Sequence, residues 1–216
     1  MMSMRNTRST IIELVDDLTP VKPLSAVDGV AYAIIATAIS VIRVVEFLGL
    51  RAGLKTGHFD PVHVIGSGQF LVLGMAAVVL VIRMSRPQTG NSIRTVIWLG
   101  ALASWLPLTA LIVQISDPDG LWAPDVIPAG LVCFARGNIF SILVFASLIW
   151  WLRQGAPTSL ERAGTLTGFA AGSFGVFALS LHCASDDIVH IGFWHTAAVA
   201  GMAGLGRSIV PPLVRW

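Results

Sequence analysis

Long apolar segments alternate with short polar links along most of this chain. After a polar start, six stretches consist almost entirely of apolar residues, each about as long as the roughly 20 residues that a helix needs to cross a bilayer. Helices in the core of a soluble protein keep one polar face, and these segments lack one. The predicted spans are about 29–50, 62–82, 95–115, 129–152, 164–182 and 191–211.

Composition supports a membrane protein. Hydrophobic residues make up 55% of the 216 residues and charged residues 12%, with a mean hydropathy of +0.78, whereas soluble domains carry about 25% charged residues. Residues 1–28 have no apolar core with a cleavage site, so they are not a signal peptide. The sequence therefore predicts an all-α integral membrane six-helix bundle (29–216) behind a short head (1–28).

The distribution of basic residues predicts the orientation, because lysine and arginine beside short loops stay in the cytoplasm. With a cytoplasmic N-terminus, the outer face holds only Arg51, Lys55 and the borderline Arg136, while Arg43 lies inside the first span. Both termini are then cytoplasmic. The other ten of the 14 basic residues fall on the inner side: Arg5, Arg8, Lys22, Arg83, Arg86, Arg94, Arg153, Arg162, Arg207 and Arg215.

Small residues indicate how the spans associate, since close backbone approach must supply the attraction between helices in lipid. Gly168 and Gly172 form a GxxxG pattern on the fifth span, and Gly201, Gly204 and Gly206 follow on the sixth. We expect tight helix packing at these positions.

Charged side chains also occur inside the first span. Arg43 and Glu46 lie three residues apart, so they share one helical face and can neutralise each other. A charge inside a membrane is a functional hypothesis by default. Here pairing and snorkelling from the outer third of the span explain both residues nearly as well.

The head contains a short amphipathic helix. Thr10 and Glu13 fit a capping box, and Pro20 and Pro23 end the helix and extend the chain. A helix this short is marginally stable alone in water, so its apolar stripe must pack on a surface. Three surfaces are available: the lipid surface, the chain's own spans or the groove of a cytoplasmic partner. Its acidic polar face argues against anionic lipid. The apolar stripe is Ile11, Leu14, Val15 and Leu18, opposite Glu13, Asp16 and Asp17.

Three further segments carry a family resemblance. The head LVDDLTPVKPL, the junction LHCASDD followed by FWH, and the terminal GRSIVPPLVRW resemble the NrsF-type membrane anti-sigma factors. In that pattern a proline follows the second cysteine, whereas Ala184 stands here, so the local turn can differ.

The resemblance implies a bacterial inner-membrane protein whose head binds an extracytoplasmic-function sigma factor and keeps it from RNA polymerase. The membrane part would sense envelope stress, with no direct nucleic-acid contact and no cofactor. The expected sigma-binding residues, with Ile11 from the same apolar stripe, are Ile11, Leu14, Val15, Asp16, Asp17, Leu18, Pro20, Val21 and Pro23.

The chain has two cysteines, and the topology places both at the outer face. Cys133 lies near the outer start of the fourth span and Cys183 just after the outer end of the fifth. The outer compartment is oxidising, so this pair could form a disulfide or bind a soft metal. Simple packing residues remain the alternative, since a disulfide requires Cα atoms within about 7 Å. With the resemblance, we expect Cys133 and Cys183 to sense oxidant or metal stress.

Histidines surround the second cysteine without a compact zinc pattern. His190 and His195 are five residues apart, which in an α-helix corresponds to about 500° and to different faces. We therefore expect a structural or aromatic-belt role for His190, Trp194 and His195, and we leave the metal unassigned.

Catalytic motifs are not found. Ser67 and Ser173 lie in GSG and GSFG, neither of which is the GxSG of intramembrane serine proteases. Walker, Rossmann and HExxH patterns are also absent. We therefore expect that this protein is not an enzyme. A small six-span transporter or a structural membrane subunit is the alternative function, although no internal repeat supports a transporter.

Overall fold

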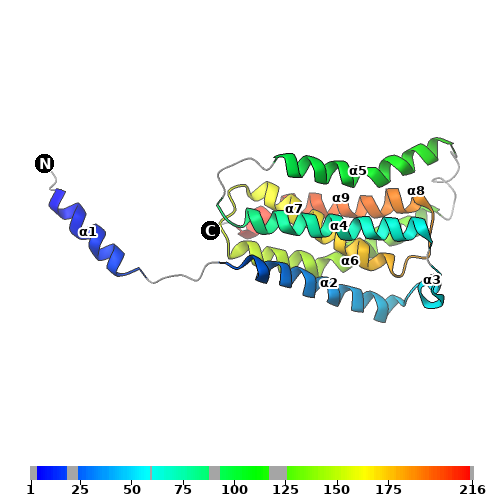
Figure 1. Cartoon of the computed structure of the whole chain (residues 1–216), viewed down its shortest axis with the longest axis horizontal. Helices are drawn as coiled ribbons and strands as arrows, with labels where there is room; N and C mark the ends of the chain where they lie inside the picture. The colour runs from blue at the N-terminus through cyan, green and yellow to red at the C-terminus, as the bar shows by residue number, and fades with distance from the viewer. Residues whose placement is uncertain (1–3, 19–23, 59, 88–92, 117–125, 215–216) are drawn as a thin grey trace.

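The computed structural model describes residues 4–18, 24–58, 60–87, 93–116 and 126–214. All regular structure in these residues is helical (Figure 1). The elements are α1 (Met4–Asp16), α2 (Ala26–Leu48), α3 (Ala52–Thr56), α4 (Pro61–Met84), α5 (Ile93–Ser116), α6 (Val126–Arg153), α7 (Leu160–Ser180), α8 (Ile188–His190), the π-helical turn η1 (Ile191–His195) and α9 (Thr196–Val214).

Six helical segments are long and apolar enough to cross a membrane, which confirms the predicted fold class. They are α2, α4, α5, α6, α7 and the continuous segment α8–η1–α9. Their ends lie within a few residues of the predicted boundaries. The division into a head and a membrane domain stays a prediction.

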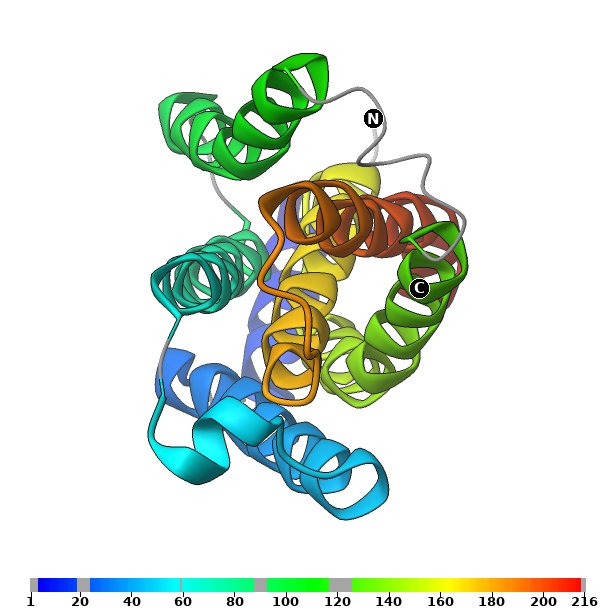
Figure 2. The ribbon, with the colours of Figure 1, turned by 90° about the vertical axis from the view of Figure 1, so that its right-hand side faces the viewer.

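Helix α7 lies at the centre of the bundle. Figure 2 views the bundle end-on, with α9, α6, α4 and α2 around α7 and with α5 at the periphery. Of the six spans, α7 is the most buried within the bundle. Of the six spans, α5 is the least buried within the bundle, so most of its surface would face lipid.

Glycines allow α7 and α9 to touch backbone to backbone. A Cβ atom added to Gly168 would lie 1.9 Å from the carbonyl oxygen of Met202, and one on Gly206 would lie 2.2 Å from that of Gly164. The predicted close packing through Gly168, Gly172 and Gly206 is therefore observed. Gly204 faces open space and takes no part.

The charged pair in the first span is an ion pair. The Arg43 guanidinium donates to the Glu46 carboxylate at 3.3 Å, and it also lies over the Phe47 ring. Both charged side chains are more than half exposed, so they face away from the bundle. This observation favours snorkelling and pairing over a buried transport site.

Helix α1 begins earlier than the sequence predicted. It starts at Met4, so Thr10 lies in its middle and the predicted capping box is wrong. No proline or glycine interrupts residues 4–10, so nothing stops the helix from extending toward the N-terminus. Pro20, Val21 and Pro23 lie outside the described residues.

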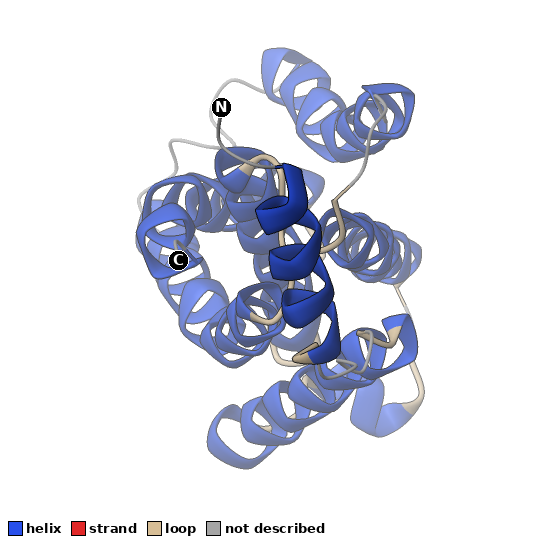
Figure 3. Cartoon of the chain, turned by 90° about the vertical axis from the view of Figure 1, so that its left-hand side faces the viewer, coloured by secondary structure: helices blue, strands red, loops and turns tan. Residues whose placement is uncertain are grey.

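The head helix lies apart from the bundle (Figure 1), and the end-on view of Figure 3 shows it in front of the spans. All side chains from Thr7 to Leu18 are exposed, including Ile11, Leu14, Val15 and Leu18, which are each more than half exposed. The apolar stripe therefore does not pack under the chain's own spans in this structure.

The glycine contact predicts a specific loss of stability. In Gly168→Ala the added methyl would overlap the Met202 carbonyl, and overpacking of this kind costs about 1–3 kcal/mol. We expect a lower free energy of unfolding in detergent micelles, measured by circular dichroism during titration with a denaturing detergent. Gly204→Ala is the matched control and should leave stability unchanged. Equal stability of the two variants would contradict the glycine-packed interface.

Candidate functional site

The structure brings the two cysteines together at the end of the bundle that carries α3 and α8. Cys133 belongs to α6, and Cys183 lies in the link between α7 and α8. Their sulfur atoms are 3.8 Å apart, and no disulfide joins them. Cys183 is buried, whereas Cys133 is partly accessible. Their proximity agrees with the topology, while their role in sensing stays a prediction.

Two histidines complete this cluster, contrary to the expectation from α-helical geometry. One ligand atom each of Cys133, Cys183, His190 and His195 lies within 4.8 Å of all the others. The reason is the π-helical turn η1, whose i→i+5 hydrogen bonding brings His195 back to the face of His190. The two rings meet edge to face, with centroids 5.5 Å apart. The prediction that they occupy different faces is wrong.

Local contacts fix the start of the sixth span. The Asp187 carboxylate accepts hydrogen bonds from the backbone N–H groups of Val189 (3.1 Å) and His190 (2.8 Å) and so caps the helix. Gly192 allows α5 to pack closely against η1, because an added Cβ atom would lie only 2.4 Å from the Cβ atom of Ala110. The cap and this contact position η1.

A tryptophan fixes α6 against η1. Trp194 packs flat on Gly130, where an added Cβ atom would lie 2.1 Å from the indole ring. Gly130 and Cys133 are three residues apart and share one face of α6. The contact therefore sets the position from which Cys133 approaches Cys183 and the histidines.

The environment of Cys183 favours its thiolate. The pKa of this thiol lies below its ordinary value, chiefly because of its contact with Cys133 Sγ and then, against the opposing effect of burial, because of its contact with His190 Nε2. His195 differs: its side chain is 2% exposed, and neither ring nitrogen has a hydrogen-bond partner. Buried imidazoles are normally paired, so His195 needs a partner.

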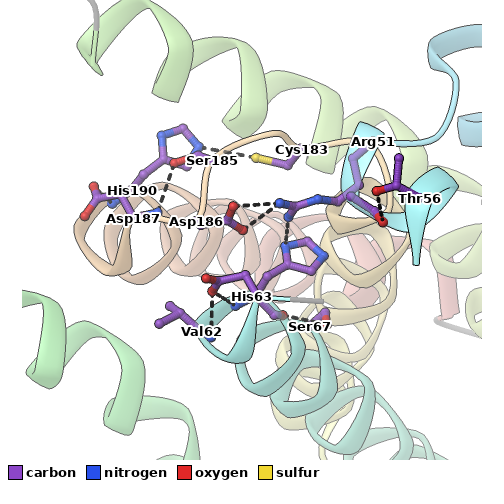
Figure 4. A network of polar contacts seen from close by, with 12 residues as sticks. Arg51, Thr56, Val62, His63, Ser67, Cys183, Ser185, Asp186, Asp187 and His190 are labelled. Carbon is purple, nitrogen blue, oxygen red and sulfur yellow. Dashed lines mark hydrogen bonds and ion pairs between the residues drawn. The ribbon is translucent and has the colours of Figure 1, made fainter. Parts of the chain in front are cut away.

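A polar network beside the cysteines links three helix ends (Figure 4). The Arg51 guanidinium donates two hydrogen bonds to Asp186, at 2.6 and 2.8 Å, and also contacts His63 Nδ1. The Arg51 backbone N–H donates to the Leu181 carbonyl at 3.0 Å. The network joins the end of α2 to the link that carries Cys183.

His182 adds a second connection between the same two elements. Its Nδ1 lies 3.1 Å from the Gly49 carbonyl, and the Arg136 guanidinium lies 3.3 Å from its Nε2. Neither connection was predicted from the sequence. The available signal was the presence of Arg51, Arg136 and Asp186 at the same predicted face.

The predicted sigma-binding residues lie apart from this cluster. Figure 1 shows α1 beyond the opposite end of the bundle. The structure places Ile11, Leu14 and Val15 on one exposed face of α1, with Asp16, Asp17 and Leu18 at its C-terminal end. No other part of the chain that the structure describes covers this apolar stripe.

Comparison with known proteins identifies relatives of the whole bundle. The family NrsF, described as "negative regulator of sigma F", matches residues 14–216. A protein of Azospira oryzae (strain ATCC BAA-33 / DSM 13638 / PS), named "Probable anti-sigma-F factor NrsF", is 24% identical over 178 residues, which cover 81% of this chain and 82% of the relative. No solved structure matches.

The Trp194 contact predicts how readily the cysteines can be joined. In Gly130→Ala the new methyl would overlap the indole ring, so α6 must shift and carry Cys133 away from Cys183. We expect a lower yield of disulfide under a mild thiol oxidant, measured by the gel shift of thiols left free for a maleimide polymer. Gly68→Ala is the control, because its Cβ atom meets open space near the same end of the bundle. An unchanged yield in Gly130→Ala would contradict this role of Trp194.

Proposed function

The chain belongs to the NrsF family of negative regulators of sigma factors, and from this premise we propose that its head holds an extracytoplasmic-function sigma factor at the inner membrane. The binding surface is the apolar stripe of α1 with the acidic and proline-containing residues that follow. While this helix is bound, it covers the surface with which the sigma factor would bind RNA polymerase.

The observation that carries this proposal is the exposed stripe of α1. Four apolar side chains that no other part of the described chain covers are expensive to leave in water. An amphipathic helix of this kind docks in an apolar groove of a partner. The family match begins at Leu14, within the stripe, and continues to the end of the chain.

The proposed topology puts α1 in the cytoplasm and the cysteine cluster at the outer face. The basic residues support this orientation through the positive-inside rule. The structure is compatible with it, because α1 and the cysteine cluster lie at opposite ends of the bundle.

A route between the two ends passes through the outer polar network. Cys183 lies in the same link as His182 and Asp186, which bind the region around Gly49 and Arg51 at the end of α2. Helix α2 in turn follows the head in sequence. A displacement of the Cys183 link would therefore act on the span that adjoins the sigma-binding segment.

Oxidation is one change that would move this link. An oxidant that accepts two electrons converts the two thiols to one disulfide and releases two protons. The sulfur atoms must then approach from 3.8 Å to about 2.05 Å. This movement draws the Cys183 link toward α6. Because Asp186 lies in the same link, the movement would also change its hydrogen bonds with Arg51. We propose that release of the sigma factor follows such a change, caused by oxidant or by a soft metal.

If α1 docks through its apolar stripe, a charge placed on the stripe should weaken binding of the sigma factor. Leu14→Asp places a carboxylate in the apolar contact, and loss of a central apolar contact costs about 2 kcal/mol or more, which is roughly thirtyfold in affinity. We expect the immobilised full-length variant to retain much less sigma factor from a cytoplasmic extract of the same cells, measured by quantitative mass spectrometry.

Ser9→Asp is the matched control, because it adds the same charge one turn before Glu13 on the polar side of α1. It should retain sigma factor as the unchanged chain does. If Leu14→Asp retains as much sigma factor as Ser9→Asp, the stripe is not the docking surface.

The sensing half makes a separate prediction. The chain has only two cysteines, so Cys133→Ser combined with Cys183→Ser removes every thiol while leaving α1 intact. We expect normal repression of a sigma-dependent reporter in unstressed cells and no induction by a thiol oxidant. Induction equal to that of the unchanged chain would rule out the cysteines as the trigger.

A further inference from the structure

The geometry points to a metal site: we propose that Cys133, Cys183, His190 and His195 together bind one zinc-like divalent cation in a tetrahedral arrangement. The site itself stands on the described geometry. Only its consequence for sigma release rests on the function proposed above.

The separations fit a tetrahedral ion. With Zn–S distances of about 2.3 Å and Zn–N distances of about 2.0–2.1 Å, such an ion holds two sulfurs about 3.8 Å apart and sulfur and nitrogen about 3.6 Å apart. The two sulfurs are 3.8 Å apart, and Cys183 Sγ lies 3.7 Å from His190 Nε2. All four donor atoms lie within 4.8 Å of one another.

The donors also select the class of cation. Two sulfurs and two imidazole nitrogens suit Zn²⁺, whereas Mg²⁺ and Ca²⁺ require oxygen ligands. The nearby carboxylates are already engaged, since Asp186 pairs with Arg51 and Asp187 caps α8. Two thiolates, two neutral imidazoles and a divalent ion sum to zero charge. Both sulfurs bind as thiolates, so binding leaves a neutral centre, which a largely buried site at the end of an apolar bundle tolerates best.

His195 supplies an independent observation. Its ring is almost fully buried at the cluster, and neither nitrogen has a hydrogen-bond partner. A bound cation would give one of these nitrogens the partner that it lacks. The π-helical turn is the backbone feature that brings His195 here, and such turns are rare and often found at functional sites.

The bound ion would join three elements. Cys133 comes from α6, Cys183 from the α7–α8 link, and the two histidines from the start of the sixth span. A thiolate bound to the ion cannot at the same time enter a disulfide. Oxidation of the pair would therefore expel the metal, and a bound ion would keep the two sulfurs from forming a disulfide.

The test is direct metal binding by the purified full-length protein in detergent. We expect one Zn²⁺ per chain after dialysis, measured by mass spectrometry of the metal. Co²⁺ in its place should show the ligand-field bands of a tetrahedral ion and a sulfur-to-cobalt charge-transfer band.

Ligand variants decide which residues hold the ion. His195→Asn, His190→Asn and Cys133→Ser should each weaken Zn²⁺ binding by at least about tenfold, the lower bound for loss of even an outer-shell partner. His58→Ala is the control and should bind normally, because His58 is exposed at the same end of the bundle but outside the cluster. Circular dichroism checks that each variant is folded, and the Co²⁺ spectrum of the unchanged chain reports sulfur and nitrogen ligation if a variant is not.

Three results would overturn the proposal: no Zn²⁺ on the unchanged chain, undiminished binding by a folded His195→Asn, or equal weakening by His58→Ala. Sigma capture measured on the same preparation separates the two proposals. A chain that captures sigma factor without binding Zn²⁺ refutes only the metal site, and one that binds Zn²⁺ without capturing sigma factor refutes only the docking.

Discussion

Backbone contact between α7 and α9 is the constraint on which the rest of the bundle depends. In a bilayer, helices gain no hydrophobic energy by pairing, so their association relies on close van der Waals packing. Gly164, Gly168 and Gly206 permit that approach because they carry no side chain. With these two helices held together, the short link between them has little freedom. Cys183 lies in this link, and the π-helical turn follows it directly.

The end of the bundle that carries α3 and α8 gathers polar groups that the rest of the spans lack. Thiols, imidazoles, arginines and carboxylates lie together where α2, α4, α6 and α7 end or begin. Among the described residues, Arg51 and Asp186 form an ion pair there, which lowers the cost of holding charges beside a bilayer. His195 lies close by and is buried, with no hydrogen-bond partner on either ring nitrogen.

The opposite end has a different character. Helix α1 lies beyond it and carries an apolar stripe that no other described residue covers, so the proposed release of a sigma factor requires the two ends to communicate. Hydrogen bonds from the Cys183 link to Gly49 and Arg51 reach the span that adjoins the head. In the function proposed above, these contacts are the path by which a change at the two thiols would reach α1.

The sequence by itself determined the elements whose signals are local. Runs of apolar residues set the six spans, and the stripe through Leu14 and Val15 indicated an amphipathic head. The pairing of Arg43 with Glu46 and the glycine contacts on α7 also followed from spacing along single helices. Cys133 and Cys183 could be placed at one face because each lies at the end of a span.

Only the tertiary structure decided what depends on departures from regular geometry or on contacts between distant segments. The five-residue spacing of His190 and His195 excludes a shared face in an α-helix and permits one in a π-helical turn, and that turn is held by α5 at Gly192 and by α6 at Gly130. Likewise, the partner of Arg51 lies 135 residues away in sequence. Periodicity describes one helix at a time, whereas this site is built by several helices that fix one another's local shape.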